Sequence, residues 1–437
     1  MRSLILLIAL GSALPAQTPA GAARVSLPDS PVGRNITAWL DAFNSGDSLR
    51  LGAYYRKYGL VRSLETQMAR RAASGGLDLV SVERVEPRYL EAVLRERATG
   101  NRLYLVSEVA AGSDFEVTQS SLVPMPRGGS PADFRIDAPT RARVIEGAIE
   151  AMNVHYVFAD VAKKMGDALR ARRERGEYDN VTNGVAFANV LTRHLRDVSH
   201  DLHLGVSFFP ERAPDPNVLQ DSVERAQRRR DLERENCGFV KAERLPGNVG
   251  YLKFNFFGEL DVCGPTASAA MNFLANVDAL VVDLRDNGGG QPDMVAYLCS
   301  YFFPDRTHLN DLWVRRTGQT REFWTRDVPG RKLRHGTPVY VLTAKRTFSG
   351  AEEFTYDLKN LKRATIVGET TGGGAHPVYT HRIDQHFSIG VPFARAINPI
   401  SKTNWEGTGV EPDVKVPAAE ALSVALKMIA DNARSRP

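Results

Sequence analysis

Two short apolar runs, each followed closely by a turn and a helical pattern, most limit what this chain can fold into. Residues 280–284 (LVVDL) and 339–342 (VYVL) are apolar and rich in β-branched side chains, which predicts buried strands. The first run leads into Gly288–Gly290, and the second leads into Ser349 and a helix over about 350–361. Alternating strands and helices predict an α/β sheet covered on both faces, with a ligand site at the carboxyl ends of its strands.

Ser349 at a strand-to-helix turn has two interpretations. As an N-cap, it would only satisfy free amides of the first helical turn. As a nucleophile, it would need an oxyanion site, and three consecutive glycines after the neighbouring strand leave bare backbone amides able to approach a reacting atom. The glycines favour the second interpretation and make Gly288, Gly289 and Gly350 the candidate oxyanion or substrate-binding residues.

Five phrases of the sequence carry a resemblance to a known family. They resemble the catalytic core of the tail-specific (C-terminal processing) serine peptidases, in the branch that includes the tricorn core protease and interphotoreceptor retinoid-binding protein. The resemblance runs from about Ile136 to the C-terminus, and it implies a crotonase-like ββα spiral with Ser349 as nucleophile. The phrases are RDVSHDLHLGV, LRDNGGG, TFSGAEEF, VGETTGGGAH and NWEGTGVEPDV.

The general base differs from that of many members of this family, which use a Lys in the phrase GEKT. Here residues 368–371 read GETT, so Thr370 stands in place of that lysine. The resemblance then implies a histidine, with His203 as the better match and His200 as its rival. Leu202 replaces the Ser of the tricorn pattern. A titrating imidazole would make the rate rise through roughly pH 6 to 8.

A histidine base needs an orienting group. Glu406 stands three residues before the Gly of GVEPD, as the family's acidic residue does, and its alternative is a surface carboxylate in a loop. His376 follows three glycines and is predicted to line the cleft without a chemical step. No metal site and no cofactor are predicted, because Cys237, Cys263 and Cys299 lack metal-binding spacing.

The leading hypothesis is an exported serine peptidase that acts on peptides or proteins by acyl-enzyme chemistry. Two alternatives use the same core: a non-catalytic carrier of hydrophobic ligands and a hydrolase of small esters. The net charge of +5 is small beside 56 basic and 51 acidic side chains, which gives no case for nucleic acid as a partner. No later stretch predicts an integral membrane anchor.

The chain divides into several parts by composition and periodicity. The N-terminal layout of one Arg, an apolar run and small residues is typical of a secretory signal peptide, so we expect a periplasmic or secreted protein. In such a compartment one disulfide could form, and Cys237 with Cys263 is the pair to test. The predicted parts are a signal peptide (1–20), an α+β domain that resembles nuclear-transport-factor-like cones (25–126), a linker (127–137), a small helical bundle (138–210) and the catalytic core without a PDZ insertion (211–437).

Overall fold

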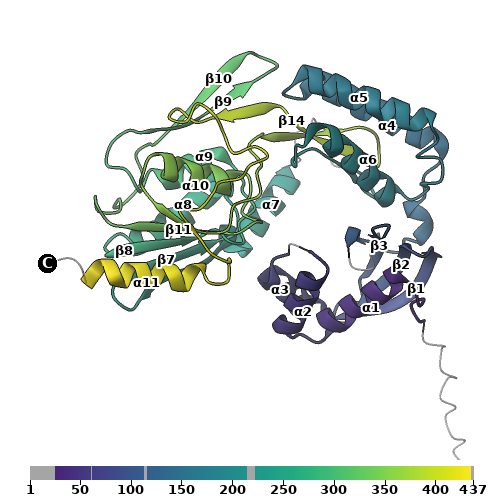
Figure 1. Ribbon diagram of the computed structural model, residues 1–437, viewed down its shortest axis with the longest axis horizontal. Coiled ribbons are helices and arrows are strands. Elements are labelled where there is room, and N and C mark those ends of the chain that lie inside the picture. Colours follow the sequence, from purple (N-terminus) through teal and green to yellow (C-terminus); the bar gives the residue numbers. More distant parts are fainter. Residues whose placement is uncertain (1–24, 61, 113–115, 214–221, 435–437) are drawn as a thin grey trace, which may run out of the picture.

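The computed structural model describes residues 25–60, 62–112, 116–213 and 222–434. The predicted signal peptide lies outside this part of the chain. No helix within the described ranges combines the length and the apolar character needed to cross a bilayer. Figure 1 shows the chain as an arch, in which a helical segment (blue) links the N-terminal part (purple) to a larger core (green to yellow).

Three helices followed by an antiparallel sheet form the N-terminal part, in the predicted order. The sheet has the strand order β1-β2-β3-β4. Apolar side chains of α1 and α2 pack on one face of the sheet, and Phe134 stacks on Tyr104 at the other face. The elements are α1 (Pro31–Asn44), α2 (Ser48–Lys57), α3 (Leu64–Ser74), β1 (Leu77–Val85), β2 (Tyr89–Glu96), β3 (Arg102–Val109) and β4 (Val117–Pro124).

The helical segment does not build its core from its own residues alone. Phe387, Ile389 and Val391 of β14 are fully buried among the apolar side chains of α4, α5 and α6. Strand β14 also pairs with β5 in a three-stranded sheet of order β13-β14-β5. A division of the chain at residue 210 therefore separates segments that pack together. The elements are η1 (Pro131–Phe134), α4 (Ala138–His155), α5 (Ala159–Glu174), α6 (Gly184–Ser199), β5 (Gly205–Phe208), β13 (Val378–Arg382) and β14 (Phe387–Pro392).

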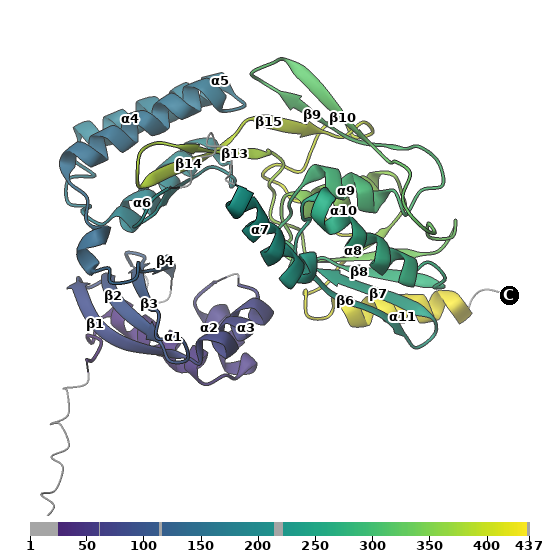
Figure 2. The ribbon, with the colours of Figure 1, turned by 180° about the vertical axis from the view of Figure 1, so that it is seen from behind.

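The core is a six-stranded sheet of order β16-β12-β11-β8-β7-β6. Its strands are parallel except for the β6–β7 pair. Helices α8, α9 and α10 bury their apolar side chains on one face, and α11 covers the other face (Figure 2). The elements are β6 (Phe239–Leu245), β7 (Val249–Phe254), α8 (Leu260–Phe273), β8 (Ala279–Asp283), α9 (Pro292–Cys299), β11 (Val339–Thr343), α10 (Gly350–Asn360), β12 (Thr365–Gly368), β16 (Val414–Lys415) and α11 (Ala421–Arg434).

A second three-stranded sheet, of order β10-β9-β15, lies beside α9 and α10. Between β5 and β6, the described residues form only α7 and the short turn η2. A disulfide joins Cys237 of η2 to Cys263 of α8, and Cys299 is a buried free thiol. The elements are α7 (Ser222–Arg234), η2 (Asn236–Gly238), β9 (His308–Val314), β10 (Gln319–Trp324) and β15 (Ala394–Ile397).

Candidate active site

Ser349 occupies a strained turn between β11 and α10. Its backbone has φ 54° and ψ −122°, a region that L-residues rarely adopt. A hydrogen bond from Phe348 N to Asn287 O (3.1 Å) ties the turn to the glycine loop that follows β8. Ser349 lines a cavity of about 540 Å³ at the carboxyl end of the sheet. An ordinary N-cap has a negative φ, so this geometry favours the nucleophile interpretation.

The glycine loop presents backbone amides to the same turn, but only some of them are free. Gly288 N donates to Asn255 O (3.1 Å), and Gly289 N donates to Asn287 Oδ1 (2.9 Å). Within the described residues, the N–H groups of Gly290 and Gly350 have no acceptor. They are neighbours, since a Cβ added to Gly350 would lie 3.1 Å from Gly290 N. Gly290 therefore fits an oxyanion role better than the predicted Gly288 and Gly289.

Gly289 has a different role, which is to let the loop approach the nucleophile. A Cβ at this position would lie 2.7 Å from Ser349 Cβ and 2.6 Å from Gly350 N. Its φ of 99° also belongs to the region that favours glycine. Any other residue here would push the two loops apart.

Glu352 holds the nucleophile turn against the glycines that follow β12. Its Oε2 accepts hydrogen bonds from Ser349 N and Gly374 N (both 2.8 Å), and its Oε1 accepts from Gly373 N (2.6 Å) and Thr371 Oγ1 (2.5 Å). Burial raises the pKa of this fully buried carboxyl, and the four donors oppose that shift. The sequence analysis did not identify Glu352. A Ser followed three residues later by Glu is the signal that could have found it.

His203 lies in the turn between α6 and β5 and lines the same cavity as Ser349. Its ring packs on Phe348, with 4.6 Å between ring centroids, and a Cβ on Gly374 would lie 2.6 Å from its Cε1. Burial lowers the pKa of His203 to about 4. Its buried Nδ1 has no hydrogen-bond partner in the described chain. The rival His200 is exposed at the C-cap of α6 and does not line the cavity.

Glu406 lies behind the imidazole, together with a carboxylate that the sequence analysis did not identify. One carboxylate oxygen of Glu406, one of Asp201 and one ring nitrogen of His203 all lie within 4.8 Å of one another. Glu406 Oε2 accepts from Ala375 N (2.5 Å), while its buried Oε1 has no partner among the described residues. Burial raises the pKa of Glu406 to about 7, and the charge of Asp201 adds to the shift.

Asp201 anchors this group of side chains. Its Oδ1 accepts from His203 N (3.0 Å), and its Oδ2 accepts from Tyr156 OH (3.2 Å). His376 Nδ1 lies 2.8 Å from Asp201 Oδ2 and 3.4 Å from Glu406 Oε2. His376 is buried and is not among the cavity-lining residues, so it lies behind the cleft and not along it as expected.

The group of Asp201, His203 and Glu406 is the part of the described chain to consider for a metal ion. Both oxygens of Asp201 already accept hydrogen bonds, and Glu406 Oε2 accepts one from Ala375 N. We therefore assign no metal to this site.

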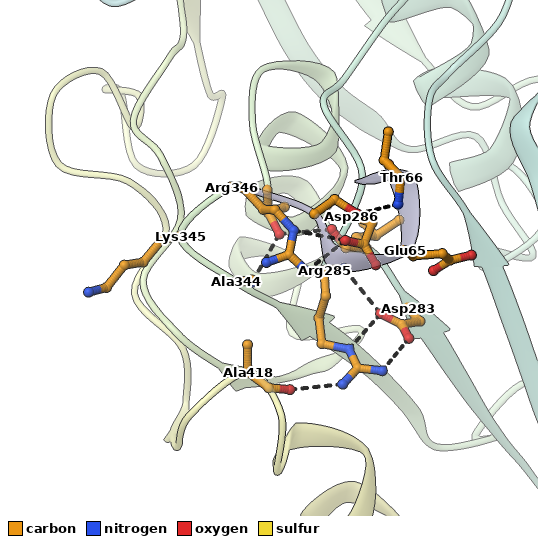
Figure 3. Close-up of polar contacts among 12 residues, drawn as sticks. Glu65, Thr66, Asp283, Arg285, Asp286, Ala344, Lys345, Arg346 and Ala418 are labelled. Carbon is orange, nitrogen blue, oxygen red and sulfur yellow. Dashed lines mark hydrogen bonds and ion pairs between the residues drawn. The ribbon is translucent and has the colours of Figure 1, made fainter. Parts of the chain in front are cut away.

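Ion pairs fix the two loops that carry the nucleophile and the glycines (Figure 3). Asp286 Oδ1 accepts from Arg346 Nε (2.8 Å), and Asp286 Oδ2 lies 3.0 Å from Lys253 Nζ. Lys253 also pairs with Glu65 of α3, which brings the N-terminal part to this edge of the core. Burial alone would raise the pKa of Asp286, but its hydrogen bonds and the two cations lower it.

A second ion pair lies beneath the first. Asp283, at the end of β8, receives a forked contact from Arg285, with Nε 2.9 Å and Nη2 2.6 Å away. Tyr251 OH also donates to Asp283 (2.6 Å), and Arg285 continues to Ala418 O (2.8 Å). Burial opposes ionisation of Asp283, yet Arg285 holds its pKa below the usual value.

Residues 248–416 match the model of peptidase family S41, and residues 138–235 match the N-terminal domain of that family in eukaryotic IRBP. The chain carries a peptidase family S41 domain. The resemblance inferred from the five sequence phrases is thereby confirmed. The core and its helices form a mixed α/β structure, as predicted for this domain.

Two curated proteins that are similar to this chain are named C-terminal processing peptidases. It is 27% identical over 207 residues to carboxyl-terminal-processing peptidase 2, chloroplastic, of Arabidopsis thaliana, covering 42% of this chain and 36% of that protein. It is 27% identical over 197 residues to the C-terminal processing peptidase, chloroplastic, of Tetradesmus obliquus, covering 41% and 39%. The chain thus spans well under half the length of these relatives.

Solved structures give a weaker likeness. The photosystem II D1 C-terminal processing protease superimposes with a TM-score of 0.40 at 17% identity, covering 64% of this chain and 94% of that one. The tricorn protease superimposes with a TM-score of 0.42 at 14% identity, covering 82% and 42%.

Proposed function

We propose that this chain is an exported serine peptidase that hydrolyses peptide bonds of peptide or protein substrates through an acyl-enzyme. The observation that carries the proposal is the meeting of Ser349, His203 and the free amides of Gly290 and Gly350 at one cavity. A nucleophile, a base and an oxyanion site are what acyl transfer requires.

The reaction proceeds in two halves. His203 removes the proton of Ser349 Oγ as that oxygen attacks the substrate carbonyl, and the carbonyl oxygen, now negative, accepts hydrogen bonds from Gly290 N and Gly350 N. His203 then gives its proton to the leaving amine as the C–N bond breaks. Water repeats the sequence on the acyl-enzyme and restores Ser349.

Glu406 serves as the group that orients His203. The proposal rests on two buried atoms without partners, His203 Nδ1 and Glu406 Oε1, which belong to neighbouring side chains. A hydrogen bond from Nδ1–H to this carboxylate would hold the imidazole in the tautomer whose Nε2 accepts the serine proton. Asp201 positions the same turn through the backbone of His203.

Export and the finer fold also belong to the proposal. The Cys237–Cys263 disulfide supports export, because such bonds persist in oxidising compartments. We propose a periplasmic or secreted location, a crotonase-like ββα spiral for the core and a structural or substrate-presenting role for the N-terminal part. Residues 25–126, 138–210 and 211–437 are proposed as the domains of the chain, with β14 of the third completing the core of the second.

Mass spectrometry after treatment with a fluorophosphonate probe tests the proposal. The wild type should carry one label, on Ser349, and Ser349→Ala should abolish both labelling and peptide hydrolysis while unfolding at nearly the same temperature. Loss of the serine at this helix start costs about 1 kcal/mol. Ser423→Ala, an exposed serine of α11, is the matched control and should label normally. An unlabelled, folded wild type would favour a carrier.

A further inference from the structure

Glu353 is a buried carboxyl in the wall of the cavity that Ser349 lines. It lies on α10 four residues after Ser349, about one helical turn or 6 Å along the axis. Its side chain lines the cavity although the residue is only 5% exposed. A charged group this deep beside a nucleophile calls for a partner, since burying an unpaired carboxylate is costly.

Among the described residues, only one donor reaches this carboxyl. Asn310 Nδ2 donates to Glu353 Oε1 at 3.2 Å, and Glu353 Oε2 has no partner in the described parts of the chain. Nearby acceptors are also unsatisfied, because the buried Asn310 Oδ1 and Asp357 Oδ2 have no donors there. The neighbouring Glu352, by contrast, accepts four hydrogen bonds. On α10 the shortage of donors is therefore found at Glu353 and Asp357, one helical turn apart, and not at Glu352.

The one Lys or Arg that lines the cavity does not neutralise Glu353. This residue, Arg321, pairs with Asp293 at 2.7 Å. Burial raises the pKa of Glu353 to about 7, with a further contribution from the charge of Asp293. When Glu353 is ionised, the side chains of Glu353, Asp293 and Arg321 together carry one more negative charge than positive charge.

Apolar side chains line the same cavity as this carboxyl. Leu312, Ala396 and Trp405 line the same cavity. A long side chain with an apolar stem and a cationic end would bury its stem on these residues and place its donors at Glu353 Oε2. Lysine and arginine side chains have this form.

We propose that Glu353 selects a Lys or Arg side chain in the substrate residue whose carbonyl Ser349 attacks. This inference rests on the proposed peptidase function and adds the class of substrate. The ammonium or guanidinium group supplies the donors that the protein lacks. An acidic residue at this substrate position would be rejected, because it would meet a second carboxylate in a buried site.

Peptide substrates that differ only in the residue before the cleaved bond test the proposal at pH 8. With Lys, kcat/KM should exceed that with norleucine, its uncharged analogue, by at least tenfold, and Glu should be the poorest. Glu353→Gln should bring the Lys to norleucine ratio close to one without loss of fluorophosphonate labelling at Ser349. Glu322→Gln, which removes an exposed carboxylate from β10, should keep the wild-type ratio.

A binding measurement separates this inference from the peptidase proposal. In the Ser349→Ala protein, calorimetry should show tighter binding of the Lys peptide than of the norleucine peptide, and Glu353→Gln in that background should remove the difference. An unlabelled wild type that still shows this difference would refute the peptidase and keep the cation pocket. Equal affinity for the two peptides, or a preference that survives Glu353→Gln, would overturn the pocket.

Discussion

Two pairs of buried or half-buried carboxylates near Ser349 differ in whether a Lys or Arg balances their charge. Asp283 and Asp286, which we call the anchor carboxylates, are paired with Arg285, Arg346 and Lys253, and their pKa values are lowered. Glu353 and Glu406, the cleft carboxylates, form no ion pair with Lys or Arg in the described chain, and their pKa values are raised to about 7.

We infer that the anchor carboxylates fix the structure, whereas the cleft carboxylates take part in the proposed reaction or in substrate binding. Permanent cations hold the anchor carboxylates ionised, so these pairs fix the loops that carry Ser349 and the glycines at every physiological pH. Glu406 instead faces imidazoles, which become cationic only when they take up a proton, and Glu353 faces the cavity. Glu406 and Glu353 thus lack a Lys or Arg partner. A protonated imidazole is expected to supply the positive charge at Glu406, and a substrate is expected to supply it at Glu353.

The largest effect should come from substitution of His203. Its imidazole lies beside Glu406, whereas the anchor carboxylates have a Lys or Arg beside them. His203→Ala should lower kcat by about four or more orders of magnitude, because Ser349 loses its base. The exposed His200 offers the control, and His200→Ala should leave hydrolysis nearly unchanged. Silencing by His200→Ala alone would show that the base was assigned to the wrong histidine.

The pH dependence of the same enzyme departs from the first expectation. A base must be neutral, and burial lowers the pKa of His203 to about 4. The step that His203 contributes to the rate profile should therefore lie near pH 4, below the range of 6 to 8 expected for an exposed imidazole. Stopped assays across pH 3.5 to 9, corrected for unfolding, measure this step.

Breaking an anchor pair should cost stability first. Asp283→Ala removes the partner of Arg285 and the acceptor for Tyr251, so we expect unfolding to become easier by about 3 to 5 kcal/mol. Asp278→Ala, which disrupts an exposed pair with Arg334, should change the free energy of unfolding by no more than about 1 kcal/mol. Equal effects in urea titrations would contradict the distinction between anchor and surface pairs.

Removing the charge of a cleft carboxylate should cost turnover first. Glu406→Gln should preserve folding and lower kcat by about two orders of magnitude, because an amide cannot stabilise the imidazolium. The wild-type rate should also rise near pH 7, as Glu406 ionises, and this upper step should vanish in the variant. Glu411→Gln, an exposed change of equal charge in the same loop, should show neither effect.

The smallest expected effect concerns stability and pH at Glu353. Its folded pKa of about 7 exceeds the ordinary value of 4.5, so the folded state binds the proton more tightly. The resulting stabilisation is present below pH 4.5 and is lost as pH rises through 7. Glu353→Gln should remove this loss, which would be visible as a flatter dependence of Tm on pH between pH 5 and 8. Parallel curves for wild type and variant would place Glu353 among ordinary carboxyls.

Local patterns predicted the central elements well. Strands β8 and β11 and the helix after Ser349 were predicted, because each is a continuous buried run or a clear helical period. Helix α8 runs from Leu260 through Pro265, although a proline in a sequence pattern usually indicates a helix boundary.

The parts that were missed depend on contacts between distant segments. Asp201 reaches His376 across 175 positions, and β14 completes the core of a bundle that lies far earlier in the chain. The choice between Gly289 and Gly290 also depended on which amide Asn287 had already taken. Motif spacing identified Ser349, His203 and Glu406, but no local pattern specifies which hydrogen bonds remain open.

The four hydrogen bonds of Glu352 have a mechanical consequence. One carboxylate accepts hydrogen bonds from Ser349 N and from Gly373 N and Gly374 N. We therefore expect the turn at Ser349 and the glycine loop after β12 to move together. A peptide that docks along the second loop would therefore pull on the nucleophile itself. Binding of the substrate would then also position Ser349 for attack. A peptide that fits poorly could occupy the cleft and still leave Ser349 wrongly oriented.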